Sequence, residues 1–88
     1  MAKRKKPVRL SAHAASYRTK RGFTAEEVEQ AIREAPWQEA QRGRTECRLD
    51  FAFDGTWNGK SYATKQVRPI FAEEANEIVV VTVYTYYF

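Results

Sequence analysis

The side chains best suited to chemistry on a phosphodiester lie in one predicted helical row near the N-terminus. His13, Tyr17 and Arg21 stand at i, i+4 and i+8, so a helix would stack them on one face, with Arg18 and Lys20 beside them. An imidazole transfers protons near neutral pH, and cations stabilise the charge that builds on a phosphate in the transition state. The row therefore predicts either a site that acts on phosphate esters or a helix in which His13 has no chemical role.

A second set of candidate residues lies near the end of the chain. Thr82, Tyr84 and Tyr86 stand at alternate positions, and simple alternation places them on the same strand face as Ile78 and Val80. Hydroxyl groups on a rigid strand can orient a phosphate or a ribose. Threonine and tyrosine also favour strands in general, so ordinary β-propensity explains the same pattern.

Three further cations, Arg48, Lys65 and Arg68, are predicted on the strands before the last one. With aromatic edges they would form a cationic platform of the kind that binds RNA. Parity places Lys65 and Arg68 on opposite faces unless Pro69 introduces a bulge, so at most one of them is expected in the site. One histidine and one cysteine do not supply a metal-ligand set, so neither a metal nor a cofactor is expected.

The charge distribution favours an anionic partner. The chain has 88 residues and a net charge of +4, and residues 1–22 contain eight lysines and arginines and no acid. A basic segment beside a more acidic remainder is typical of proteins that bind nucleic acid, although a short basic tail can also serve solubility alone. This length fits one domain, so we expect a basic tail at residues 1–9 and a single domain at residues 10–88.

Two helices are predicted before the strands begin. Ser11 can cap a first helix over residues 11–21, and Thr24 with Glu27 forms a capping box for a second helix over residues 24–35. Helices of this length are marginal in water on their own. Both therefore have to pack on a sheet.

After the second helix the pattern changes to two-residue alternation. It predicts strands at residues 45–54, 61–72 and 77–87 and a short strand at 37–41. The predicted fold class is α+β, with two N-terminal helices packed on an antiparallel β-sheet of three to four strands.

Three broad classes of protein are excluded. The length is too short for a Rossmann or barrel enzyme. No apolar run approaches the roughly 18–20 residues of a membrane span, and the basic start has no apolar segment of a secretory signal. We therefore expect a cytoplasmic protein without a membrane partner.

Short motifs follow one another along the chain: His13-Ala14, Arg21-Gly22-Phe23-Thr24, Glu27-Val28, Ala31-Ile32, Pro36, Lys65-Gln66-Val67-Arg68-Pro69-Ile70-Phe71 and Thr82-Val83-Tyr84. In this order they resemble a family of small prokaryotic proteins of unknown function, over roughly residues 10–86. That family looks related to the RelE-like and BrnT-like toxins, which are metal-independent ribonucleases. The resemblance implies a RelE- or barnase-like fold, and it implies active-site roles for His13, Arg21, Thr82 and Tyr84 and a phosphate contact from Lys65 or Arg68.

The function expected from the resemblance is that of a metal-independent endoribonuclease of the toxin–antitoxin type. Such an enzyme cleaves single-stranded RNA by attack of a 2′-hydroxyl on the adjacent phosphate. The expected partners are RNA, an antitoxin protein and a second copy of the chain. Tyr17 stands where the family pattern has an arginine one turn after the histidine. The alternative is a non-catalytic module with the same fold that binds RNA or a protein.

Overall fold

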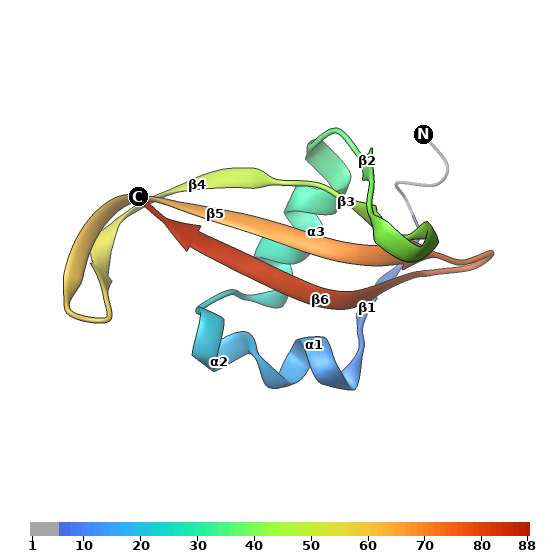
Figure 1. The fold of residues 1–88 in the computed structure, drawn as a ribbon, viewed down its shortest axis with the longest axis horizontal. Helices are drawn as coiled ribbons and strands as arrows, with labels where there is room; N and C mark the ends of the chain where they lie inside the picture. Colours follow the sequence, from blue (N-terminus) through green and yellow to red (C-terminus); the bar gives the residue numbers. More distant parts are fainter. Residues whose placement is uncertain (1–5) are drawn as a thin grey trace.

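The computed structural model describes residues 6–88, in which six strands form one sheet partly covered by three helices (Figure 1). The elements, in chain order, are β1 (Val8–Leu10), α1 (Ala12–Ser16), α2 (Arg18–Arg21), α3 (Ala25–Glu34), β2 (Gln38–Glu39), the 3-10 turn η2 (Gln41–Gly43), β3 (Thr45–Glu46), β4 (Leu49–Trp57), β5 (Lys60–Glu73) and β6 (Ile78–Tyr87). Residues 1–5 of the predicted basic tail lie outside the described residues. No helix within residues 6–88 has both the length and the apolar character needed to cross a membrane.

The sheet is built around β5, which has 14 residues. β6 pairs antiparallel with one edge of β5, while β3 and β4 pair in succession with the other edge. β2 extends the sheet beside β3, and β1 pairs in parallel with β6. The predicted RelE- or barnase-like arrangement, two N-terminal helices on three to four antiparallel strands, is therefore wrong, because the described chain forms a mixed six-stranded sheet and contains more strand than helix.

The parallel strand β1 begins within the predicted tail, residues 1–9, and ends at Leu10, the first residue of the predicted domain. Val8 and Leu10 are apolar and flank Arg9, which is the alternation of a short strand. Val8 lies opposite Ile78 in β6, and Arg9 forms an ion pair with Glu77 at 3.1 Å. Three residues are too few for an alternating pattern to identify a strand. These residues form a strand because they pair with the edge of β6, which exists only in the folded chain.

The helical segment before Gly22 is two short helices, not the predicted single one. α1 begins after Ser11, whose hydroxyl accepts a hydrogen bond from the Ala14 N–H at 3.1 Å. The helix breaks at Tyr17, where φ is −97° and ψ is 2°. Ala14 is the one fully buried residue in α1 and α2, so no continuous apolar stripe holds a straight helix. The two helices instead follow β6 (Figure 1).

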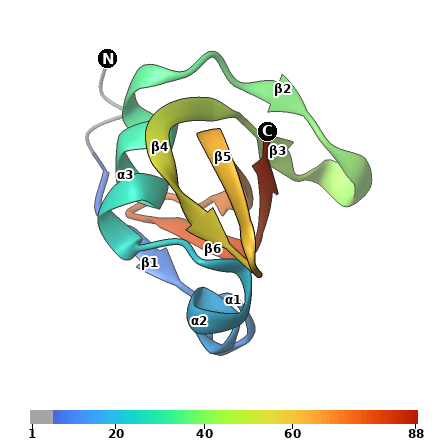
Figure 2. The same ribbon diagram turned by 90° about the vertical axis from the view of Figure 1, so that its left-hand side faces the viewer.

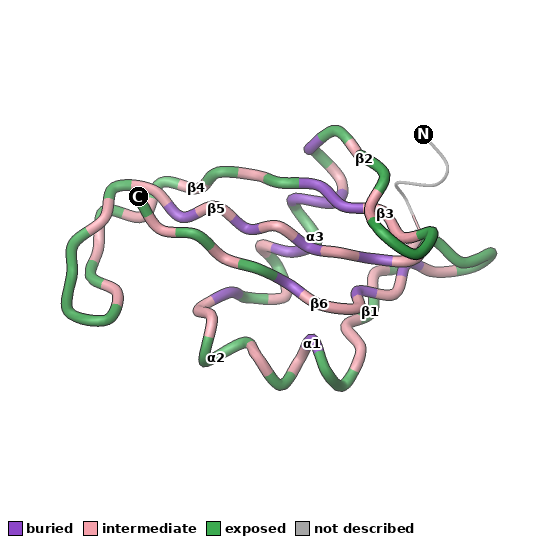
Figure 3. The backbone as a smooth tube through the Cα atoms, in the orientation of Figure 1, coloured by how far each residue is buried: buried purple, intermediate pink, exposed green. Residues whose placement is uncertain are grey.

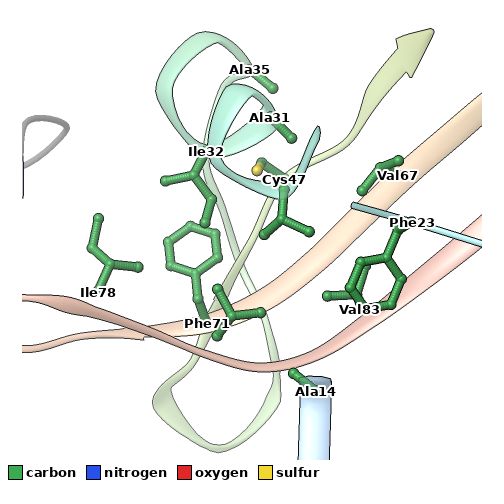
Figure 4. Packing of buried hydrophobic residues seen from close by; sticks show 12 residues of the cluster. Ala14, Phe23, Ala31, Ile32, Ala35, Cys47, Val67, Phe71, Ile78 and Val83 are labelled. Carbon is green, nitrogen blue, oxygen red and sulfur yellow. The ribbon is translucent and has the colours of Figure 1, made fainter. Parts of the chain in front are cut away.

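α3 covers one face of the sheet. Thr24 and Glu27 form the predicted capping box, with hydrogen bonds of 3.0 and 3.1 Å. Ile32 points from α3 toward Phe71 of β5 (Figure 4), and the buried residues gather between α3 and the middle of the long strands (Figure 3). Viewed along the strands, α3 lies on one side of the molecule, and β2 with the turn that follows it lies on the other (Figure 2).

A β-bulge in β6 decides which side chains face α3. Phe71 pairs with Val80 and Ile70 pairs with Thr82, so Val81 has no partner in β5. The extra residue reverses the parity of the strand. The prediction that Thr82, Tyr84 and Tyr86 share a face with Ile78 and Val80 is therefore wrong. Up to Val80 the even-numbered residues are buried under α3, whereas beyond the bulge Val83 is buried and the even-numbered residues face away.

Candidate functional site

The face of the sheet that points away from α3, here called the open face, carries polar and aromatic side chains. Its residues on the central strands are Glu46, Asp50, Gln66, Arg68, Ile70, Thr82, Tyr84 and Tyr86, and Arg48 lies between β3 and β4 within 3.9 Å of Glu46. Strand pairing aligns them in rows, one of which is Asp50, Gln66 and Tyr86, and within this row Gln66 donates a hydrogen bond to Asp50 at 2.9 Å. No described helix covers this face, so a large ligand can approach it.

Tyr84 lies on β6 beside Arg68 of β5, and the guanidinium groups of two arginines lie near its ring. The Arg21 guanidinium carbon is 5.1 Å from the centre of the Tyr84 ring, and the corresponding carbon of Arg68 is 5.7 Å from it. Tyr84 is itself 40% exposed. Both cations are attracted by the ring, and a ligand beside Tyr84 would bring its anionic groups within reach of them.

Arg21 is held rigidly at the edge of β6. Its Nη1 donates to the Val83 carbonyl at 2.8 Å and to Thr82 Oγ1 at 3.3 Å. The Arg21 carbonyl accepts hydrogen bonds from the hydroxyls of Thr85 and Tyr87 on the covered side. A guanidinium has five N–H donors, so Arg21 retains donors for a ligand after these contacts.

The predicted helical row continues the open face past its edge, although it spans two helices. The Arg21 guanidinium carbon lies 4.0 Å from the centre of the Tyr17 ring, and the His13 ring lies 4.9 Å from that of Tyr17 at an angle of 61°. Arg18 and Lys20 are exposed beside this row, with the Lys20 Nζ 5.6 Å from the Tyr17 ring. The chain of contacts therefore connects the imidazole with the arginine that borders Tyr84.

Arg68 and Glu46 form an ion pair on the open face. Arg68 donates to both carboxylate oxygens, with distances of 2.9 and 2.8 Å, and a third contact of 3.2 Å joins it to the Tyr86 hydroxyl. These hydrogen bonds hold the pKa of the Glu46 carboxyl below its ordinary value, against burial, which raises it. The same pairing raises the pKa of Arg68. Both groups are thus charged at neutral pH, and their geometry is fixed before any ligand arrives.

A groove of about 680 Å³ lies between the open face and the turn that joins β2 to β3. Thr82, Tyr84 and Arg68 contribute to it from the sheet, and Arg42 and Arg44 contribute from the turn. Arg42 takes a positive φ of 61°, which completes this tight turn. The sequence predicted a short strand at 37–41 and the next strand from residue 45. It gave no sign that the segment between them forms a wall of a groove, apart from the pair of arginines on either side of Gly43.

Two of the predicted cations lie elsewhere or at the periphery. Lys65 is buried on the covered face, where its ammonium group contacts Glu27 at 2.7 Å and the Gly22 carbonyl at 3.0 Å. The expected separation of Lys65 from Arg68 is confirmed, and of the two Arg68 is the cation on the open face. Arg48 is on the open face but exposed, 3.9 Å from Glu46.

The structure thus brings most of the predicted site into contact. Arg21, Thr82, Tyr84 and Arg68 form one cluster, and His13 joins it through Tyr17 and Arg21. No family model, curated protein or solved structure matches the chain. Function therefore has to be inferred from these side chains.

Proposed function

We propose that the open face binds single-stranded RNA, with bases stacked on its tyrosines and phosphates held by the arginines beside them. The observation that carries this proposal is the exposed ring of Tyr84 near the guanidinium groups of Arg21 and Arg68. Aromatic platforms next to cations are the usual means by which proteins hold unpaired bases and their backbone.

The row of aromatic side chains along β6 favours a single strand over a duplex. Tyr84, Tyr86 and Phe88 are the exposed large hydrophobic residues of the described chain, with exposed fractions of 40%, 42% and 58%. Residues at alternate strand positions are about 6.8 Å apart. Such a row suits bases that have separated from one another, whereas the faces of bases in a duplex are already covered by their neighbours.

Binding of a fluorescent oligouridylate, measured by anisotropy, tests this proposal. We expect Tyr84→Ala to weaken binding about 5- to 150-fold, because one base–aromatic stack contributes roughly 1–3 kcal/mol. Tyr84→Phe keeps the ring and is expected to bind as the wild type does. Affinity should also fall as salt rises, because bound phosphates release counterions.

Lys60→Gln is the charge control, because Lys60 is exposed at the start of β5 and its substitution removes one cation away from the cluster. Equal affinity of Tyr84→Ala and wild type would refute the proposal. Equal affinity for the DNA oligomer of the same sequence would show that the open face binds single-stranded nucleic acid without distinguishing RNA from DNA.

Metal-independent cleavage of the bound RNA is a second candidate function. The observation in its favour is the His13 imidazole at the end of the contacts that run through Tyr17 to Arg21. In this reaction the 2′-oxygen bonds to phosphorus as its proton passes to a base, and the 5′-oxygen leaves with a proton from an acid. His13 would serve as one of these groups, and Arg21 would hold the phosphate oxygens.

Incubation of long single-stranded RNA with the purified chain in EDTA tests the cleavage. The expected product carries a 2′,3′-cyclic phosphate. His13→Ala should lower the rate about 10²–10⁴-fold while leaving RNA affinity unchanged, because a proton-transfer group acts in the reaction and not in binding. Intact RNA with the wild type, or equal rates with and without His13, would leave binding as the function.

A further inference from the structure

We propose that the groove beneath the β2–β3 turn binds the terminal phosphate of an RNA strand, an inference that rests on the proposed RNA binding. Its walls carry Arg42 and Arg44, and its floor carries Arg68 and Tyr84. A volume of about 680 Å³ lies within the range of pockets that hold a nucleotide-sized ligand.

The arginines of the turn are available to a ligand. Within residues 6–88 neither Arg42 nor Arg44 takes part in an ion pair, whereas Arg68 is held by Glu46. Glu39 is the remaining charged side chain of the lining, and it offsets one of the two arginines. A phosphate monoester carries a charge of about −1.5 to −2 at neutral pH, more than the single charge of a phosphodiester. The lining therefore keeps one positive charge in excess, and its attraction for a phosphate grows with the charge of that phosphate, so a strand end is favoured over a position inside a strand.

The aromatic row leads to this groove and stops there. Phe88, just beyond the end of β6, and Tyr86 and Tyr84 within it follow one another toward Thr82, which lines the groove. Base stacking along the row would carry the strand from the end of β6 to the turn, so that its last phosphate meets Arg42 and Arg44.

Beyond the groove, the described surface has no excess of cations that could bind a longer polyanion. A second hollow follows it, lined by Arg44 and Arg9 together with two glutamates, Glu74 and Glu77. Arg9 is already paired with Glu77 at 3.1 Å. A phosphate that passed Arg44 would therefore meet the carboxylate of Glu74, which takes part in no ion pair within residues 6–88, so the binding track ends at the groove.

The test compares hexauridylates that carry a 5′-phosphate, a 3′-phosphate or neither, each with its fluorophore at the opposite end. We expect one phosphorylated form to bind at least about tenfold tighter than the unphosphorylated oligomer, because a charge-assisted hydrogen bond contributes about 1.5–3 kcal/mol. The phosphorylated oligomer that binds more tightly identifies which end of the strand, 5′ or 3′, the groove binds. Equal affinity of all three oligomers would overturn the inference.

Variants of the groove separate this inference from the proposed function. The double variant Arg42→Gln/Arg44→Gln should lose the preference for the phosphorylated oligomer and keep its affinity for the unphosphorylated one. Glu39→Gln should strengthen the preference, and Lys60→Gln should leave it unchanged. A preference that survives in the double variant would refute the groove as the site. Failure of every oligomer to bind would overturn the proposed RNA binding and this inference together.

Discussion

Removing Arg68 should destabilise the fold strongly at neutral pH, because it leaves the Glu46 carboxylate without its partner. The Glu46 side chain is 10% exposed and that of Arg68 is 28% exposed, and two hydrogen bonds of 2.9 and 2.8 Å join them. Breaking a buried ion pair from one side typically costs about 3–5 kcal/mol. Since Arg68 is partly open to solvent, we expect Arg68→Met to lower the free energy of unfolding by about 3 kcal/mol, the lower end of that range.

The loss should depend on pH in a defined direction. In the wild type the pKa of Glu46 is lowered by Arg68. Its contribution to stability is therefore present above the pKa of the unfolded state and disappears as the pH falls through the folded-state pKa. In Arg68→Met the two hydrogen bonds are lost and the exposed Arg48, 3.9 Å from Glu46, is the remaining nearby cation. Burial then raises the pKa of Glu46 above its wild-type value, so protonation at mildly acidic pH relieves the poorly compensated charge. The difference between the two proteins is thus largest near pH 7 and shrinks toward acidic pH.

Urea unfolding followed by tryptophan fluorescence, at neutral and at acidic pH, measures this difference. The double variant Glu46→Leu/Arg68→Met is the control, because replacing both charges with apolar groups of similar size is often neutral or stabilising. It should recover most of the stability lost in the single variant. A loss that stays the same at all pH values, or a double variant as unstable as the single one, would refute the role of the unpaired carboxylate.

Three further outcomes are expected. Gly22→Ala should destabilise more than Gly43→Ala in thermal unfolding: both have positive φ, but a Cβ at Gly22 would lie 2.6 Å from Trp57 Cζ3, whereas nothing lies within 4 Å at Gly43. Lys65→Met should destabilise by about 1–3 kcal/mol in urea unfolding, because Glu27 and a carbonyl lose their buried donor. The RNA-free chain should sediment as a dimer through its exposed aromatic row, and a monomer at high concentration would contradict this.

Local signals identified the elements but not the sheet they build. The capping box of Thr24 and Glu27 and the alternation along β4, β5 and β6 involve neighbours in the sequence, so they can be read from it. The pairing of Val8–Leu10 with β6 and the bulge at Val81 depend on contacts between distant segments. No periodicity encodes these contacts, and they account for the error in the predicted fold.

The same distinction applies to the candidate site. Helical spacing predicted that His13 and Arg21 lie in one row. The row persists across the break at Tyr17, because the Tyr17 ring contacts both the His13 ring and the Arg21 guanidinium. Glu46 alternates with Cys47 as any solvent-facing strand residue would, so nothing in the sequence marks it as the buried partner of Arg68. That role follows from the register that places β3 beside β5.

The bulge at Val81 separates β6 into two halves that can change independently during evolution. Deleting this single residue would exchange inside and outside for everything after it, moving Tyr84 and Tyr86 into the core and Val83 to the surface. A gap at this position in an alignment of related chains would therefore signal a different ligand surface, even where every other residue is identical. For the same reason a designer could replace the open-face residues beyond the bulge without altering the aliphatic half that supports α3.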